Sequence, residues 1–185
     1  GLYSSIIEKD VYRIHSKINK NLFERVSKYI ISNTGKIFSA LSIARYLHNE
    51  LPSNEQKKFS ETVNNYAKFL EECFFTEECK PYYLKGKESL NGMKKYYATD
   101  VGLRSNLSEV IEYDDSFALE NIIYNELVFR GYTVKYGKFP EGEIDFVVQK
   151  GNKKCLIQVA YTVSLQQAFE REYFAFKKVS DNSPK

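Results

Sequence analysis

Two apolar, strand-forming runs separated by a short turn constrain the fold of this chain most strongly. The first run is Gly142–Val148 and the second is Cys155–Ala160, and residues 151–154 between them are typical of a hairpin connection. Each run carries one polar side chain, Asp145 in the first and Gln158 in the second. The two runs therefore predict neighbouring strands on which these two side chains lie close together.

A third oxygen-bearing side chain, Glu120, lies on the helix that the sequence predicts before these strands. Together with Asp145 and Gln158 it would form a pocket of oxygen ligands, which suit a hard cation such as Mg²⁺. Each residue also has an ordinary structural explanation. Glu120 can pair along its helix, and Asp145 and Gln158 on apolar strands need polar partners whatever their function.

Length and composition fit a soluble globular protein. A chain of 185 residues allows one domain or two small ones, and 43% hydrophobic with 28% charged residues is ordinary. The net charge of +3 permits a basic face but does not by itself identify a nucleic-acid-binding protein. No apolar run reaches the roughly 18 residues that span a bilayer, so we expect no membrane association. The oligomeric state is not predicted.

Cysteine and histidine usage indicates neither a disulfide framework nor a zinc site. The odd number of cysteines, Cys73, Cys79 and Cys155, and their spacing favour a reducing, cytoplasmic setting. His15 and His48 are isolated in the sequence, and we expect both on the surface.

Helical periodicity dominates the first 71 residues. We expect a helix or docking arm over residues 3–13 and helices over 21–33, 39–49 and 60–71, with 52–58 as a polar loop. Ser39 and Ser60 are the expected N-caps. The buried stripe predicted for the last helix comprises Val63, Tyr66, Ala67 and Leu70. Two strand-like runs, 74–84 and 94–98, follow with a turn at 85–92.

Three helices followed by a hairpin are the element order of a winged helix-turn-helix. In such a module the third helix enters the major groove of DNA and the hairpin reaches along the backbone. Polar residues of the third helix, of the loop before it and of the hairpin tip would contact phosphates and base edges. These candidates are Lys57, Lys58, Thr62, Asn64, Asn65, Lys68, Lys85 and Lys87. The same side chains would also serve simply to solvate a helix, and winged helices often bind proteins.

The second half of the sequence predicts an α/β unit after a boundary near residues 100–115. Its helix, 118–131, has Gly131 as C-cap. Strands follow over 132–138 and over the two opening runs, and a helix over 166–179 closes the unit. We expect five apolar residues of the first helix to point inward: Leu119, Ile122, Ile123, Leu127 and Val128. The predicted domains are residues 1–104 and 105–185.

Several sequence blocks, in this order and spacing, resemble the C-terminal region of a large family of predicted prokaryotic AAA+ ATPases. The blocks are Phe38–Leu47, Thr62–Glu71, Lys95–Arg104, Leu119–Leu127, Glu143–Phe146 and Ile157–Tyr161. The resemblance implies an upstream ATP-hydrolysing domain, a winged-helix-like segment and a restriction-endonuclease-like domain of the PD-(D/E)xK type. It implies that ATP is a cofactor only of that upstream domain, which we expect to be missing here. It also implies that the sequence is trimmed at both ends and that family members continue into a further strand after residue 185.

The resemblance also assigns roles to the polar cluster. Glu120, Asp145 and Gln158 match the metal-binding and catalytic positions of the nuclease-like fold, and Ala160 stands where the family's catalytic lysine would be. A methyl group cannot carry charge or lower the pKa of a metal-bound water. Gln158 is a neutral ligand where many such sites have a carboxylate, so Mg²⁺ binding would be weak.

The sequence therefore predicts an α/β protein (α+β overall), a winged-helix-like N-terminal part followed by a small restriction-endonuclease-like domain with a mixed sheet. Its expected function is to bind DNA or a partner for an ATPase through a degenerate nuclease-like domain. Two alternatives remain open: an active Mg²⁺-dependent DNA endonuclease, and a module that makes only protein contacts.

Overall fold

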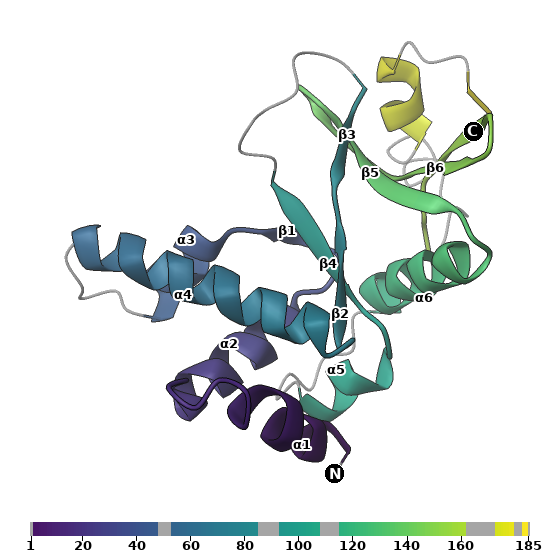
Figure 1. The fold of residues 1–185 in the computed structure, drawn as a ribbon. Coiled ribbons are helices and arrows are strands. Elements are labelled where there is room, and N and C mark those ends of the chain that lie inside the picture. Colours follow the sequence, from purple (N-terminus) through teal and green to yellow (C-terminus); the bar gives the residue numbers. More distant parts are fainter. Residues whose placement is uncertain are drawn as a thin grey trace. The chain divides into compact units, whose positions relative to one another are not determined.

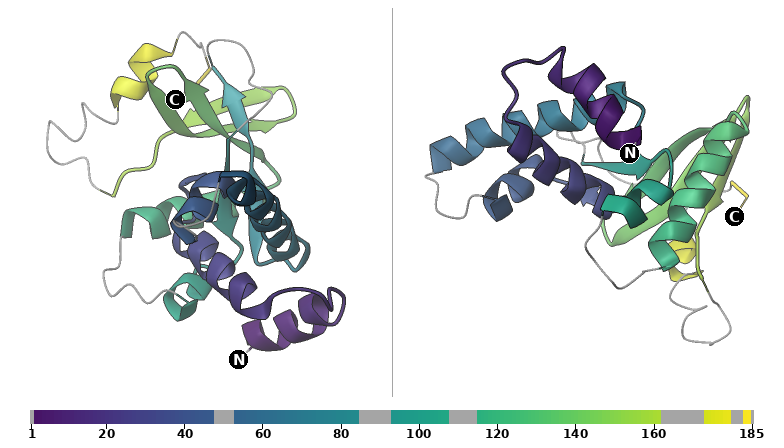
Figure 2. Two further views of the ribbon diagram at one scale, coloured as in Figure 1. Left: turned by 90° about the vertical axis from the view of Figure 1, so that its left-hand side faces the viewer. Right: turned by 90° about the horizontal axis from the view of Figure 1, so that it is seen from below.

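The protein has an α/β fold in which the chain forms two compact units. The computed structural model describes residues 2–47, 53–84, 93–107, 115–161, 173–179 and 183–184. One unit comprises Gly1–Glu78 with Tyr96–Ile111, and the other Cys79–Lys95 with Glu112–Lys185 (Figures 1 and 2). The predicted division after residue 104 thus differs at two segments: 79–95 groups with the second unit, and 105–111 groups with the first. In the described parts, no helix is long and apolar enough to cross a membrane.

Helices build most of the first unit. They are α1 (Leu2–Ile6), the π-helix η1 (Ile7–Tyr12), α2 (Lys20–Ser32), α3 (Ala40–Leu47), α4 (Ser53–Glu72) and α5 (Gly102–Leu107). The predicted stripe on α4 is confirmed, because Val63, Tyr66, Ala67 and Leu70 are all buried in the core with Phe23 and Val26 of α2. Ile7 and Val11 of η1 are buried in the same core, so the N-terminal segment is helical and integral to this unit.

The start of α4 differs from the prediction. The helix begins at Ser53, so residues 53–58 are not a loop and Ser60 is not an N-cap. The segment Glu55–Lys58 consists of good helix formers, and this propensity outweighs the polarity that suggested a loop. The predicted cap of α3 is confirmed, since the Ser39 hydroxyl accepts a hydrogen bond from the Ser42 backbone N–H at 3.2 Å.

A three-stranded sheet accompanies these helices. Its strands are β1 (Ile37–Phe38), β2 (Thr76–Cys79) and β4 (Lys94–Ala98), in the order β1-β4-β2. The predicted run 74–84 is wrong as a single strand: it divides into β2 and β3 (Pro81–Tyr83), and β3 joins a different sheet. Proline offers no backbone N–H to a ladder, which explains the division at this point.

The second unit contains a four-stranded mixed sheet and the helix α6 (Asp115–Phe129). The strand order is β3-β5-β6-β7, with β3 parallel to β5 (Thr133–Phe139) and the other neighbours antiparallel. The predicted hairpin is confirmed as β6 (Gly142–Lys150) and β7 (Lys153–Ile157). Its turn is shorter than expected, because Lys150 already pairs with Lys153 and Gly151 takes a positive φ of 58°.

A β-bulge in β6 determines which way its side chains point. Lys135 of β5 pairs with Val147, but Gly137 pairs with Ile144, so β6 has one extra residue at Asp145 and Phe146. Ile144 and Val147 therefore both face the core that also contains Phe139, Leu156 and Phe176, although simple alternation would place them on opposite faces. Asp145 and Phe146 therefore lie on the side of the sheet that faces α6, and the centroid of the Phe146 ring is 6.1 Å from that of Tyr124.

Gly137 allows the close packing opposite this bulge. A Cβ at this position would lie 2.7 Å from Leu84 Cδ1, 3.0 Å from Val147 Cγ2 and 3.1 Å from the Ile144 Cβ. We expect Gly137→Ala to lower the free energy of unfolding by about 1–3 kcal/mol, because the Leu84, Val147 and Ile144 side chains must move to admit the methyl group. Urea denaturation measures the change, with Lys138→Ala on the same strand as the control. A Gly137→Ala protein of wild-type stability would contradict the packing described.

The inward face of α6 differs from the prediction. Asn121 and Tyr124 are buried, whereas Ile122 is 49% exposed. The apolar residues of α6 are distributed over all sides of the helix, so their spacing did not define one buried face. The predicted C-cap is confirmed, because Gly131 has a φ of 77° and the Tyr132 N–H bonds to the Leu127 carbonyl. Of the predicted closing helix, 173–178 is helical and 166–172 lies outside the described residues.

Candidate functional site

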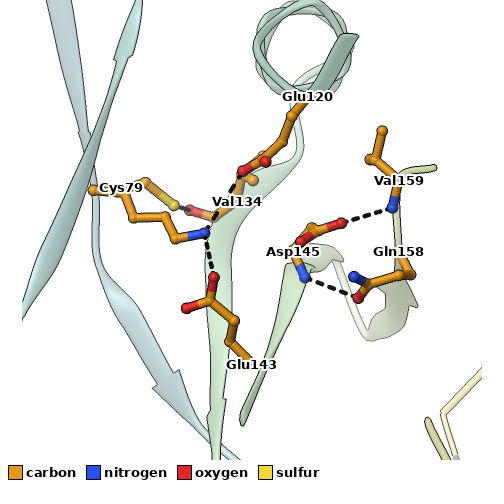
Figure 3. Close-up of polar contacts among 8 residues, drawn as sticks. Cys79, Glu120, Val134, Glu143, Asp145, Gln158 and Val159 are labelled. Carbon is orange, nitrogen blue, oxygen red and sulfur yellow. Dashed lines mark hydrogen bonds and ion pairs between the residues drawn. The ribbon is translucent and has the colours of Figure 1, made fainter. Parts of the chain in front are cut away.

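A buried lysine, Lys95, is the centre of a charged cluster in the second unit. Its side chain is 2% exposed, and its Nζ lies 2.9 Å from Glu143 Oε1 and 3.6 Å from Glu120 Oε1. Glu143 comes from β6 and Glu120 from α6, and both carboxylates point toward this ammonium (Figure 3). The Lys95 ammonium thus occupies the space between the two acids.

The aromatic ring of Tyr136 borders the same ammonium. Lys95 Nζ lies 5.3 Å from the ring centroid, within the range of a cation–π contact. The Tyr136 hydroxyl donates a 2.6 Å hydrogen bond to the Met93 carbonyl, two residues before Lys95. Burial, and secondly the charge of Glu143, raise the pKa of the Tyr136 hydroxyl, so Tyr136 is a neutral donor. It holds the start of β4 and thereby the lysine.

Asp145 and Gln158 meet at the end of the hairpin, as predicted. The Gln158 Oε1 accepts a 3.3 Å hydrogen bond from the Asp145 backbone N–H, and the Asp145 Oδ2 accepts a 2.7 Å bond from the Val159 N–H (Figure 3). The regular ladder between β6 and β7 ends at the pair Phe146 and Ile157. These two side-chain bonds therefore continue the pairing beyond the last ladder pair.

Burial and neighbouring charges change the proton affinities in the cluster. Asp145 is 9% exposed, and its pKa is raised to about 7, chiefly by burial and also by Glu120 and Glu143, although the Val159 N–H and Lys95 oppose this. Burial lowers the pKa of Lys95, but the charges of Glu120, Glu143 and Asp145 outweigh it and leave that pKa raised. Lys95 is therefore a permanent cation, and Asp145 titrates near neutrality.

The predicted ligand set does not fit a divalent cation as these residues are placed. Glu120 is turned to Lys95, an Asp145 oxygen to Val159, and the Gln158 oxygen to the Asp145 backbone. Within the described ranges, no group of three or more His, Cys, Asp or Glu side chains is arranged to hold a metal ion. The positive charge among the carboxylates comes from Lys95.

Sequence reasoning did not select Lys95 as a site residue. The signal available was its position in the strand Lys94–Ala98, where Tyr96, Tyr97 and Ala98 are all buried. A lysine in a buried strand needs a negatively charged partner, because burying an unpaired charge is costly. The partner Glu143 is 48 positions away in sequence, so the pair itself could not be read from spacing.

The predicted DNA-contacting residues have varied surroundings. On α4, Lys58, Asn65 and Lys68 are exposed, and Thr62 and Asn64 are half-buried. The side chain of Lys57, and Lys85 and Lys87 altogether, lie outside the described residues. His15 is half-buried rather than on the open surface, because its ring stacks on Phe69 at 3.8 Å. His48 lies outside the described residues.

Comparison with known proteins gives a family but no activity. An uncharacterised protein of Haemophilus influenzae is 29% identical over 163 residues, which cover 88% of this chain and 40% of that protein. The chain thus spans about two-fifths of the length of this relative. No solved structure matches significantly. A family model described as a domain of unknown function, DUF8612, matches residues 1–114, and the chain belongs to this family.

Proposed function

We propose that this chain is the non-ATPase part of a AAA+ ATPase-like protein and binds DNA through a winged-helix-like first unit. The observation that carries the proposal is the order α2, β1, α3, α4, β2, β3, β4, in which β3 joins the other sheet and the remaining strands form the sheet β1-β4-β2. In this order α4 takes the place of the recognition helix, and β2 with β4 takes that of the wing.

The exposed side of α4 supports the same proposal. Lys58 and Lys68 are exposed about three turns apart along the helix, with Asn65 exposed between them. Lysines suit phosphates, and asparagine suits phosphates or the edge of adenine. Glu61 is exposed nearby and would weaken the field, so we expect moderate affinity with a clear dependence on salt.

We assign the second unit to binding rather than cleavage, as a degenerate nuclease-like domain. Lys95 compensates the charges of Glu120 and Glu143, and Asp145 and Gln158 are committed to the backbone of the hairpin. This arrangement stabilises the sheet without a metal ion. ATP binding is proposed only for an ATPase domain, and Mg²⁺ only at low affinity. The three free thiols, Cys73, Cys79 and Cys155, fit a cytoplasmic setting.

Neutralising the basic side of α4 tests the proposal. We expect Lys57→Ala, Lys58→Ala and Lys68→Ala together to weaken duplex DNA binding at least ten-fold. The slope of log affinity against log salt should fall by roughly two to three, about one for each lost phosphate contact. Fluorescence anisotropy over a salt series measures both quantities.

A matched triple variant is the control for net charge. Lys9, Lys28 and Lys36 are exposed in the same unit but lie outside α4, and their replacement by alanine should have a smaller effect. Equal losses for the two triple variants would remove α4 as the contact surface. Absence of DNA binding at low salt, with a stable complex with an ATPase portion, would establish a purely protein-binding module instead.

One observation favours an active endonuclease as the second candidate. A buried lysine, Lys95, stands beside Glu120 and Glu143, although Ala160 occupies the position where the resembled enzymes have theirs. Incubation with Mn²⁺ and plasmid, single-stranded or branched DNA separates the two functions. Cleavage that is lost in Asp145→Ala would establish the nuclease, and intact DNA in all three assays would exclude it.

A further inference from the structure

A groove in the first unit is formed by the segment between η1 and α2 and by one side of α4. Its volume is about 450 Å³, and the residues that line it are Ile14–Ile18, Thr62, Asn65, Tyr66 and Phe69. This volume is within the range of about 300–1,000 Å³ found for small-ligand pockets. Two of the candidates predicted to contact DNA, Thr62 and Asn65, thus also line this groove.

The segment that forms one wall is held in place by backbone hydrogen bonds. The His15 N–H donates to the Val11 carbonyl at 2.8 Å, and the Ile18 N–H donates to the His15 carbonyl at 3.0 Å. Asn19 then caps α2 through its side chain, which accepts from the Leu22 N–H at 3.1 Å. The wall is therefore preorganised, which reduces the entropy lost when a ligand binds.

A flat surface inside the groove suits a planar ligand. The rings of His15 and Phe69 are stacked with centroids 3.8 Å apart and an interplanar angle of 22°. Ile14, which is 69% exposed, adds apolar surface beside this stack. Nucleobases stack on such platforms irrespective of their sequence, because every base has a π-face.

The charges around this groove favour an anion. Among its described lining residues there is no aspartate or glutamate, while Lys17 is exposed. Outside the lining, Lys58 lies one turn before Thr62 and Glu61 one turn before Asn65 on α4, so these two charges offset each other. A second cavity of the same unit, about 500 Å³ in volume, has the opposite character, since Asp10, Glu72 and Asp100 line it. Of the two cavities, only the first matches the charge of a phosphodiester strand.

We propose that this groove binds an unpaired nucleotide of a DNA strand, an inference that rests on the proposed DNA-binding function. The base extends the stack of His15 and Phe69, Asn65 and Thr62 bind the edge of the base, and Lys17 pairs with a flanking phosphate. The chain thereby prefers single-stranded or partly unpaired DNA to a closed duplex.

Anisotropy titrations of the whole 185-residue chain test this preference. The probes are a labelled oligothymidine of about 12 nucleotides, an abasic strand of the same length and a duplex of the same length. We expect the oligothymidine to bind roughly ten-fold more tightly than the abasic strand, because only the former can stack. We expect Asn65→Ala and Lys17→Glu each to weaken oligothymidine binding roughly five- to ten-fold. Lys17→Glu should change duplex binding less than two-fold, because Lys17 lies outside α4.

Arg25→Glu is the matched control for Lys17→Glu, because Arg25 is exposed in the same unit and does not line the groove. Asn65 and Lys17 are both exposed, so these variants should fold, and thermal unfolding checks that they do. Equal losses for Lys17→Glu and Arg25→Glu, or equal affinity for abasic and thymidine strands, would overturn the groove as a nucleotide site. If the wild-type chain binds the duplex but neither single strand, the groove is not a nucleotide site, and the proposed DNA-binding function still stands. Binding of none of the three probes would overturn the DNA-binding function as well.

Discussion

Replacing Lys95 by methionine should destabilise the protein by about 3–5 kcal/mol, because it leaves carboxylates without their buried counter-charge. Methionine keeps the length and much of the volume of the side chain, so the loss reports charge rather than a cavity. The Glu120 side chain is 13% exposed, so its unpaired charge should account for most of the loss of stability. The Glu143 side chain is 36% exposed and can turn toward water. Guanidinium denaturation of the wild-type and variant chains measures the difference in the free energy of unfolding.

Two further variants separate the role of charge from that of packing. Lys94→Met changes the adjacent, half-buried lysine and should cost less than about 1 kcal/mol, since the Lys94 side chain keeps access to solvent. Lys95→Met combined with Glu120→Gln and Glu143→Gln should recover part of the loss, because no unpaired charge remains. If the combined variant is no more stable than Lys95→Met alone, the cluster is not held by charge compensation.

Local patterns sufficed to predict most of the elements. The hairpin of β6 and β7 and the buried stripe of α4 follow from apolar periodicity over short windows, and both are confirmed. The proximity of Asp145 and Gln158 followed from the same hairpin and is also confirmed. What the sequence predicted of the site was therefore the part that depends on neighbours in one supersecondary motif.

The remainder depended on contacts between distant segments. The bulge at Asp145 and Phe146 is a property of the register with β5, so an alternating pattern along β6 alone could not reveal it. The role of Lys95 depends on its ion pairs with Glu120 and Glu143, which lie on other elements.

The end of α4 near Phe74 is a second feature that residue-type rules did not predict. After α4 the Phe75 N–H bonds to the Leu70 carbonyl, and Phe74 takes a φ of 58° where glycine is usual. No residue-type signal marked this end of the helix.

The contribution of Asp145 to stability should fall as the pH rises from about 4 to about 7, because Asp145 holds its proton longer in the folded state. The unfolded carboxyl has a pKa near the ordinary 3.8, and the folded one about 7. Between these values the folded protein binds more protons than the unfolded chain, so raising the pH favours unfolding. Above pH 7 both states are ionised at this residue and its contribution becomes constant. The full change is on the order of 4 kcal/mol for a shift of this size.

Asp145→Asn should remove this pH dependence, since the amide oxygen can still accept the Val159 N–H but cannot titrate. The groups that face Asp145 are Lys95, Glu120 and Glu143, and all remain in the variant. Glu141→Gln, in the exposed turn before β6, is the control and should leave the wild-type profile unchanged. Urea denaturation at several pH values between 4 and 8 gives the three profiles. Because a neutral side chain fits this buried site better than a carboxylate, the asparagine variant should be more stable than the wild type at pH 8. A less stable variant at that pH would mean that the attraction of Lys95 outweighs the cost of burial.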